Sequence, residues 1–236
     1  MDVLYVKIKD DILDKITSGV YEVGQIIPTE IELSQQYEVS RPTIRQAIQI
    51  LVNEGYLEKR KKRGTIVCSS KIQQEFTQFI ESFDSEMSRK GRVSKTKVIT
   101  LKKETANEEV VQQLQLEDDK DVFKLVRLRY VDEQPNVLVT TYVPSHLFSD
   151  FLSVDFTCNS LYGIFQQKGY PVQSIRRKLE TIKADETVAD LLDVCEGDPL
   201  FYFHSLGLSK DRIPVEYSIS KYRGDINSFV FELTHR

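Results

Sequence analysis

The spacing of apolar residues near the start of the chain predicts two helices separated by a turn. A short helix is expected over 30–37, because Thr29 and Glu32 have the spacing of a capping box. A second helix is expected between Ser40, which can serve as its N-cap, and Gly55, which suits a helix end. Its apolar positions recur three and four residues apart and form one stripe, made of Ile44, Ala47, Ile48, Leu51 and Val52.

Two short strands follow, expected at 56–58 and 65–68. A basic loop joins them, made of Lys59, Arg60, Lys61, Lys62, Arg63 and Gly64. Such a loop suits phosphate contact or entry into the minor groove. Residues 1–38 hold three Lys against eight acids, net −5, whereas residues 39–71 hold eight cations against two acids, net +6. This segregation presents one basic face to a polyanion although the whole chain is acidic.

Two helices, a turn and a basic hairpin in this order predict a winged helix-turn-helix, which places one helix in a DNA groove. A helical pair alone is more often plain packing, and a cationic run alone is more often a solvated loop; their order and spacing together favour DNA binding. Arg and Gln side chains near the start of the second helix can pair bidentately with guanine and adenine. We expect DNA contacts from Ser40, Arg41, Thr43, Arg45, Gln46, Lys61, Lys62, Arg63 and Gly64.

Residues 4–69 resemble the N-terminal domain of the GntR superfamily of bacterial transcription regulators. The resemblance rests on the opening helix from LYVKIKDD to LSQQY, the turn and helix VSRPTIRQAIQILVNEGYL, and the wing KRGTIV. In that family the residues that approach DNA match Ser40, Arg41, Thr43, Arg45, Arg63 and Gly64. Ile31 departs from the pattern, because many members have a polar or basic residue after the P-x-E triplet.

Beyond residue 76 the patterns alternate between strands and helices. Strands are expected at 95–103, 122–132, 136–143, 172–183, 200–209, 214–222 and 228–234. Helices are expected at 82–90, 107–114, 160–168 and 185–193. The connections at 132–136 and 209–214 are short and rich in turn residues, which favours hairpins over crossovers. We therefore predict an antiparallel sheet flanked by helices, an α+β fold.

The composition is that of a soluble globular protein, with 236 residues, 40% hydrophobic and 29% charged. We expect a DNA-binding domain over 1–70, a linker over 71–78 and a second domain over 79–236. No signal-peptide pattern and no run of about 18 apolar residues is found, which predicts a cytoplasmic, nucleoid-associated protein without membrane contact. The three Cys and three His are scattered, so no metal or cofactor is expected, and no catalytic nucleophile stands out.

The strand at 122–132 carries two arginines on one face. Side chains alternate across a strand, so Arg127 and Arg129 project together, about 6.6 Å apart along the strand. Two guanidiniums this close repel unless an anion or carboxylates lie between them, and their planar forks suit phosphate. The alternative is a surface strand whose arginines pair with acids such as Glu180 or Glu216.

A second anion-binding feature is expected at the helix start that contains Ser160 and Tyr162. Free backbone donors and the helix dipole favour a negative group there. The alternative for Ser160 is simple capping, which is the commoner role.

Residues 76–236 resemble the UTRA domain of the HutC branch of the same superfamily, whose fold is similar to chorismate lyase. The resemblance rests on FIESFDSEMSRKG, LVRLRYVDEQPNVLVTTYVP, NSLYGIF, DLLDVCEGDPLF and IPVEYSISKYRGD. In members that bind amino-sugar phosphates, matching positions hold the ligand, which implies effector contacts from Ser82, Arg127, Arg129, Ser160, Tyr162, Glu216 and Tyr222, with Arg223 nearby. Val139 departs, because amino-sugar sensors have a Glu there, so a different sugar or a non-sugar anion is implied.

These features predict a repressor that binds a palindromic DNA operator as a homodimer and is released by a small anionic effector, above all a phosphorylated sugar. Two alternatives belong to other classes. The lyase-like fold suggests an enzyme acting on a phosphorylated or aromatic acid, although fold alone does not carry activity. The third hypothesis is an architectural DNA-binding protein without an effector.

Overall fold

The computed structural model describes residues 4–53, 55–60, 63–68, 71–75 and 80–231. The chain divides into two units, Met1–Ile72 and Gln73–Arg236. Each unit has buried apolar residues of its own. None of the helices in the described ranges is long and apolar enough to cross a bilayer.

The N-terminal unit consists of three helices followed by a two-stranded hairpin. Its elements are α1 (Leu4–Thr17), α2 (Glu30–Gln36), α3 (Arg41–Asn53), β1 (Leu57–Arg60) and β2 (Gly64–Val67). The apolar stripe of α3 is buried in the common core, with Ile44, Ala47, Ile48 and Leu51 at most 1% exposed. The strands β1 and β2 pair antiparallel. The predicted winged helix-turn-helix is therefore confirmed.

The predicted capping box starts α2. The backbone N–H of Thr29 donates to Glu32 Oε2 at 2.7 Å, and the N–H of Glu32 donates to Thr29 Oγ1 at 3.3 Å. Two backbone donors at the helix start are thus satisfied by side chains. This fixes where α2 begins, directly before Glu30.

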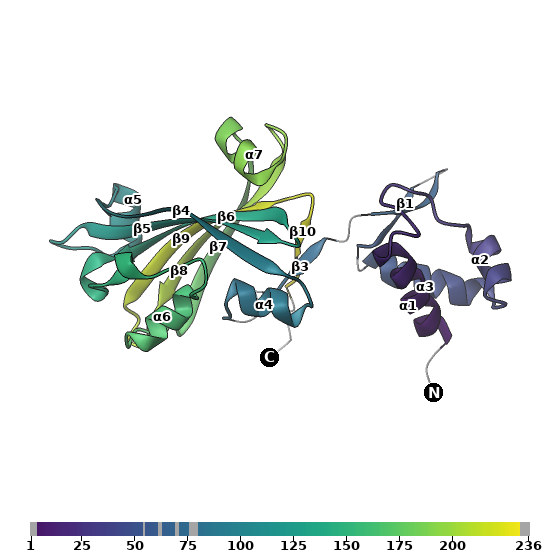
Figure 1. The fold of residues 1–236 in the computed structure, drawn as a ribbon, viewed down its shortest axis with the longest axis horizontal. Helices are drawn as coiled ribbons and strands as arrows, with labels where there is room; N and C mark the ends of the chain where they lie inside the picture. The colour runs from purple at the N-terminus through teal and green to yellow at the C-terminus, as the bar shows by residue number, and fades with distance from the viewer. Residues whose placement is uncertain (1–3, 54, 61–62, 69–70, 76–79, 232–236) are drawn as a thin grey trace. The chain divides into compact units, whose positions relative to one another are not determined.

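The C-terminal unit is built on six antiparallel strands in the order β4-β5-β6-β9-β8-β7. Their bounds are β4 (Ser94–Thr105), β5 (Asp121–Val131), β6 (Gln134–Pro144), β7 (Ser174–Lys183), β8 (Pro199–Leu208) and β9 (Pro214–Arg223). The helices α4 (Phe83–Arg89) and α6 (Leu161–Gln167) lie on one face of this sheet, and α5 (Glu108–Leu114) and α7 (Glu186–Leu192) lie on the other (Figure 1). The predicted α+β fold with an antiparallel sheet is confirmed.

The two faces of the sheet are covered differently. On one face, α5 and α7 pack apolar residues against the strands, such as Leu114 near Tyr217 and Leu192 near Leu128. On the other face, α6 packs Phe165 into an aromatic cluster with Phe148 at one end of the sheet. The part of this face between α4 and α6 carries polar side chains instead, and the candidate site lies there.

Some boundaries differ from the sequence-based expectation. The hairpin between β5 and β6 turns at Asp132 and Glu133, with φ of 48° and 66°, so β6 already begins at Gln134. Within the expected linker, β3 (Ile72–Gln74) pairs with β10 (Asn227–Phe229). The end of the expected strand 228–234 lies outside the described residues. Two 3-10 turns that were not expected, Ser145–Leu147 and Phe151–Ser153, follow β6.

Candidate functional site

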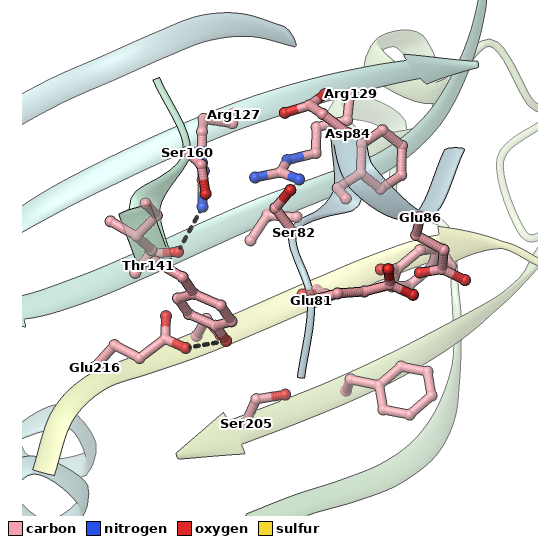
Figure 2. A pocket seen from close by; sticks show the side chains of 18 of the residues that line it. Glu81, Ser82, Asp84, Glu86, Arg127, Arg129, Thr141, Ser160, Ser205 and Glu216 are labelled. Atoms are coloured by element: carbon pink, nitrogen blue, oxygen red, sulfur yellow. Dashed lines mark hydrogen bonds between the residues drawn. The ribbon is translucent and has the colours of Figure 1, made fainter. Parts of the chain in front are cut away.

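The polar part of the sheet forms the floor of a pocket (Figure 2). The floor consists of two neighbouring rows of residues that are partners across the strands. The first row is Thr141, Ser218, Ser205 and Arg177. The second row is Arg127, Val139, Ser220 and Phe203. The side chains in the central strands are short, so the space above them stays open between α4 and α6.

The arginines of β5 point into this pocket, as the alternation along their strand predicts (Figure 2). Arg127 is 3% exposed, and burial together with the charge of Arg129 lowers its pKa to about 9. Its Nη2 donates to Thr141 Oγ1 at 3.3 Å, while the Arg129 guanidinium lies 4.9 Å from the centre of the Phe83 ring. The Nε atoms of both arginines are buried and have no hydrogen-bond partner among the described residues. Buried charged donors of this kind favour an anion between them.

Glu216 of β9 supplies the carboxylate of the pocket floor and is 2% exposed. Tyr162 donates its hydroxyl hydrogen to Glu216 Oε1 at 2.6 Å. Burial raises the pKa of Glu216, against the opposing effects of this hydrogen bond and of the Arg127 charge. Burial and the charge of Glu216 also raise the pKa of Tyr162 well above its ordinary value. At neutral pH the tyrosine is therefore protonated and orients the carboxylate.

The starts of two helices complete the pocket wall. Ser82 caps α4 by accepting from the N–H of Ser85 at 3.1 Å, and Ser160 caps α6 by accepting from the N–H of Gly163 at 3.3 Å. Both serines also line the pocket. Ser160 therefore has both roles that were considered for it: it caps α6, and it lines the pocket.

All seven residues expected to contact an effector line this one pocket, namely Ser82, Arg127, Arg129, Ser160, Tyr162, Glu216 and Tyr222. Their part in binding stays a prediction. The surface-strand alternative is wrong for Arg127, whose side chain is buried. Glu180 instead pairs with Lys178 at 2.9 Å. Arg223 pairs with Asp225 at 2.7 Å and does not belong to the lining.

Sequence reasoning missed the lining residues that come from the central and far strands. These are above all Thr141, Arg177, Ser205, Ser218 and Ser220. Ser218 and Ser220 lie between Glu216 and Tyr222 on one strand, so alternation along that strand could have identified them. Thr141, Arg177 and Ser205 reach the same face through the register of strands far apart in the sequence, which a single sequence does not give.

The helix α4 connects the pocket to the segment at 73–75. Glu86 lines the pocket and is 1% exposed. Its Oε1 accepts from the backbone N–H of Glu75 at 2.5 Å and from Lys90 Nζ at 2.7 Å. Lys90 also donates to the carbonyl of Gln73, and Arg89 pairs with Glu75 at 2.8 Å. One wall of the pocket is therefore fastened to the segment that follows the DNA-binding unit in the chain.

The start of α3 presents the residues expected to contact DNA. Ser40, Arg41 and Gln46 are exposed and Thr43 is half-buried. The hydroxyl oxygens of Ser40 and Thr43 are 2.9 Å apart. Ile31, the departure from the family pattern, is 52% exposed in α2.

Arg45 is also exposed, and Glu30 holds its side chain. Arg45 Nε and Nη2 donate to Glu30 Oε2 at 3.1 and 3.0 Å, and Lys59 Nζ lies 3.5 Å from Glu30 Oε1. Arg63 and Gly64 are exposed at the turn of the hairpin. Lys61 and Lys62, which were expected to contact DNA, lie outside the described residues.

Because Gly207 of β8 has no side chain, the Glu216 side chain can occupy the space beside it. A Cβ atom at position 207 would lie 2.7 Å from Glu216 Cγ and 3.1 Å from Oε1. Gly207→Ala should therefore displace the Glu216 side chain and lower the free energy of unfolding by about 2 kcal/mol, as overpacking does. Urea denaturation followed by circular dichroism measures the loss. Adding Glu216→Ala should recover part of it, because the overlap is removed; a double variant with no recovery would contradict this explanation.

Two family patterns cover most of the chain. Residues 4–67 match the family described as bacterial regulatory proteins, gntR family, and residues 89–226 match the UTRA domain. The first match covers the winged helix-turn-helix, and the second covers the sheet with the pocket.

Curated relatives match along nearly the whole chain. The HTH-type transcriptional regulator GgaR of Escherichia coli (strain K12) is 32% identical over 229 residues, which is 97% of this chain and 90% of the relative. The HTH-type transcriptional regulator GmuR of Bacillus subtilis (strain 168) is 30% identical over 94% of both chains. The "Probable fructoselysine utilization operon transcriptional repressor" of Escherichia coli (strain K12) is 32% identical over 91% of this chain and 88% of the relative.

A solved structure has the same arrangement of elements. The crystal structure of PhnF from Mycobacterium smegmatis matches with a TM-score of 0.86 and 25% identity, over 99% of this chain and 100% of that chain. The likeness therefore extends over both units.

Proposed function

Because the chain belongs to the gntR family of bacterial regulatory proteins and carries a UTRA domain, we propose that it is a homodimeric repressor. In this proposal residues 1–70 bind a palindromic operator, residues 71–78 act as a linker, and residues 79–236 dimerise and bind a small anionic effector, above all a phosphorylated sugar. The protein acts on DNA in the cytoplasm and leaves its operator when the effector binds.

The arginine pair of β5, with its buried Nε atoms, is the observation that carries the effector role. Arg127 and Arg129 place two buried Nε donors in one pocket without partners among the described residues. Guanidinium groups bind phosphate through charge-assisted hydrogen bonds, which are the strong ones. Ser82 and Ser160 add hydroxyl groups at the same pocket. A phosphate group fits this set of donors better than a neutral ligand does.

The DNA-binding role rests on the exposed start of α3 and on the family. Two such helices related by a two-fold axis, about 34 Å apart, match the half-sites of a palindrome. An effector lowers operator affinity only to the extent that it prefers the arrangement that does not bind DNA. One relative is named as a probable transcriptional repressor of a utilization operon, which supports a repressor role for this chain.

Two measurements on the full chain test the proposal. Thermal unfolding is recorded with inorganic phosphate and a panel of phosphorylated sugars, and a gel shift with DNA upstream of the gene is repeated with each stabilising compound. We expect a phosphorylated compound to raise the melting temperature and to release the DNA. If none of them changes the melting temperature, the effector role is lost. Turnover of a stabilising compound would favour the enzyme alternative. The relatives are named as transcriptional regulators, which favours the regulator over the enzyme.

Arg45→Ala should weaken specific DNA binding by about 1 to 3 kcal/mol and relax sequence choice, as loss of a bidentate base contact does. Glu30 engages Nε and one hydrogen of Nη2 of Arg45, which fixes the guanidinium and leaves both Nη1 hydrogens and the second Nη2 hydrogen available for a bidentate contact to a base. Gel-shift titrations against operator and unrelated DNA at one salt concentration measure both effects. Arg45→Lys serves as control, because it keeps the charge and should retain non-specific affinity. Unchanged operator affinity in Arg45→Ala would refute the contact.

A further inference from the structure

We propose that Ile31, at the start of α2, reads DNA sequence through an apolar contact with the 5-methyl group of a thymine in the major groove, beside the base that Arg45 contacts. This inference rests on the proposed DNA-binding role and adds a specificity-determining residue to it. Ile31 is 52% exposed, so most of its side chain is open to a partner outside the domain core.

The contacts of neighbouring residues show which side of α2 carries Ile31. Successive residues of a helix point about 100° apart. Leu33 is fully buried in the core, and Ser34 donates its hydroxyl hydrogen to the carbonyl of Val39, in the turn before α3, at 2.6 Å. Glu30 contacts α3 directly. Rotation around α2 therefore passes from the core side to the side that faces α3, and then to Ile31 on the outer side.

Glu30 brings the start of α2 next to the exposed guanidinium of Arg45. Its Oε2 accepts from Nε and Nη2 of Arg45 at 3.1 and 3.0 Å, and its Oε1 lies 3.5 Å from Lys59 Nζ in β1. Ile31 is the next residue, with its Cα about 3.8 Å from that of Glu30. The major groove is about 12 Å wide, so the Arg45 and Ile31 side chains can enter one groove together.

The charges around Ile31 favour contact with a base over contact with phosphate. Ile31 lies between two acids, and both are engaged: Glu30 by the cations of α3 and β1, and Glu32 by the backbone N–H of Thr29 at 2.7 Å. An isoleucine offers no donor to a phosphate group, and the carboxylates beside it repel one. The 5-methyl group of thymine is the apolar group that base pairs present in the major groove, and its burial against an aliphatic side chain is favourable.

Replacement of single thymines in the DNA tests this contact on the full-length protein. The bound segment of the DNA upstream of the gene is located by footprinting, and each thymine is replaced in turn by deoxyuridine, which lacks the methyl group and keeps the pairing edge. A buried methyl group corresponds to about a 4-fold change in affinity. At one position we therefore expect gel-shift affinity to fall by about 4-fold when one half-site is changed and by about 15-fold when both are changed.

Variants of Ile31 assign this sensitivity to one side chain. Ile31→Ala should weaken binding to the unmodified segment by a similar factor, and deoxyuridine at the sensitive position should then cost nothing further. Ile31→Val keeps a branched apolar side chain and should stay sensitive. Val20→Ala is the matched control, because Val20 is an apolar residue of the same unit with 62% exposure and lies outside the helix pair. It should bind both forms of the DNA as the wild type does.

The outcomes separate this inference from the proposed function. The inference is overturned if no thymine methyl affects binding, or if Ile31→Ala remains sensitive at every position where the wild type is. Equal weakening of the bound segment and of unrelated DNA in Ile31→Ala also overturns it, because Ile31 would then pack against the DNA backbone. Absence of specific binding by the wild type to any upstream DNA overturns the proposed function itself.

Discussion

Arg127→Met should remove most of the affinity for phosphorylated ligands and at the same time stabilise the ligand-free protein. The guanidinium is buried and lies beside Arg129, so its charge is costly until an anion arrives. Each charge-assisted hydrogen bond to the anion contributes about 1.5 to 3 kcal/mol, so the loss of affinity should be about 100-fold or more. Replacement by an apolar side chain of similar length should raise the free energy of unfolding by about 1 to 4 kcal/mol.

Titration calorimetry with inorganic phosphate and urea denaturation without ligand measure the two effects of Arg127→Met. Lys124→Met is the control, because Lys124 lies on the same strand but on the opposite face, where it pairs with Glu104 at 3.5 Å. It should leave phosphate affinity unchanged. Phosphate affinity at the wild-type level in Arg127→Met would show that the buried arginine does not bind the anion.

The same substitution has a signature in the pH dependence of stability. Burial lowers the pKa of Arg127 to about 9, so the penalty for its charge is present in full at lower pH. Between about pH 9 and the ordinary arginine value, the folded protein binds fewer protons than the unfolded chain, and the free energy of unfolding therefore gains a contribution that rises with pH. Arg127→Met should lack this contribution, so its stability advantage over the wild type should shrink as pH rises from 8 to 10.

The arginine pair and the helix starts could be predicted because their signals are local. Strand alternation places Arg127 and Arg129 on one face, and Ser160, directly before its helix, caps that helix as expected. In the same way, the apolar stripe of α3 and the capping box at Thr29 can each be predicted from a few neighbouring residues. These elements therefore appear in the structure within a few residues of their expected positions.

Features that depend on non-local pairing could not be predicted. Arg177 reaches the pocket because β7 pairs with β8 in one register; a shift by one residue would turn its side chain to the other face. The pairing of β3 with β10 joins short segments about 150 residues apart, anchored by the buried Gln74 amide, which donates to Asn227 Oδ1 at 2.7 Å. Such short segments have no periodicity of their own, which is why residues 72–74 were expected to be part of a linker.

Lys90→Met should lower the free energy of unfolding of the C-terminal unit by about 3 kcal/mol, because it leaves the Glu86 carboxylate buried without its cation. Glu86 is 1% exposed and Lys90 lies 2.7 Å from its Oε1, with the lysine side chain 17% exposed. The backbone N–H of Glu75 remains as a donor, but a single neutral donor does not replace the cation. Urea denaturation measures the loss.

A double-mutant cycle with Glu86→Gln separates this cause from a general packing defect. Glutamine keeps an acceptor for the N–H of Glu75 and carries no charge, so Glu86→Gln combined with Lys90→Met should be more stable than Lys90→Met alone. Since Lys90 also holds the carbonyl of Gln73, proteolysis at 73–75 should be faster in both Lys90 variants than in the wild type. A double variant that loses the sum of the two single losses would mean that the carboxylate and the lysine do not act as a pair. The attachment of residues 73–75 to the pocket wall would then need another cause, with the Arg89 to Glu75 ion pair as the remaining contact to substitute.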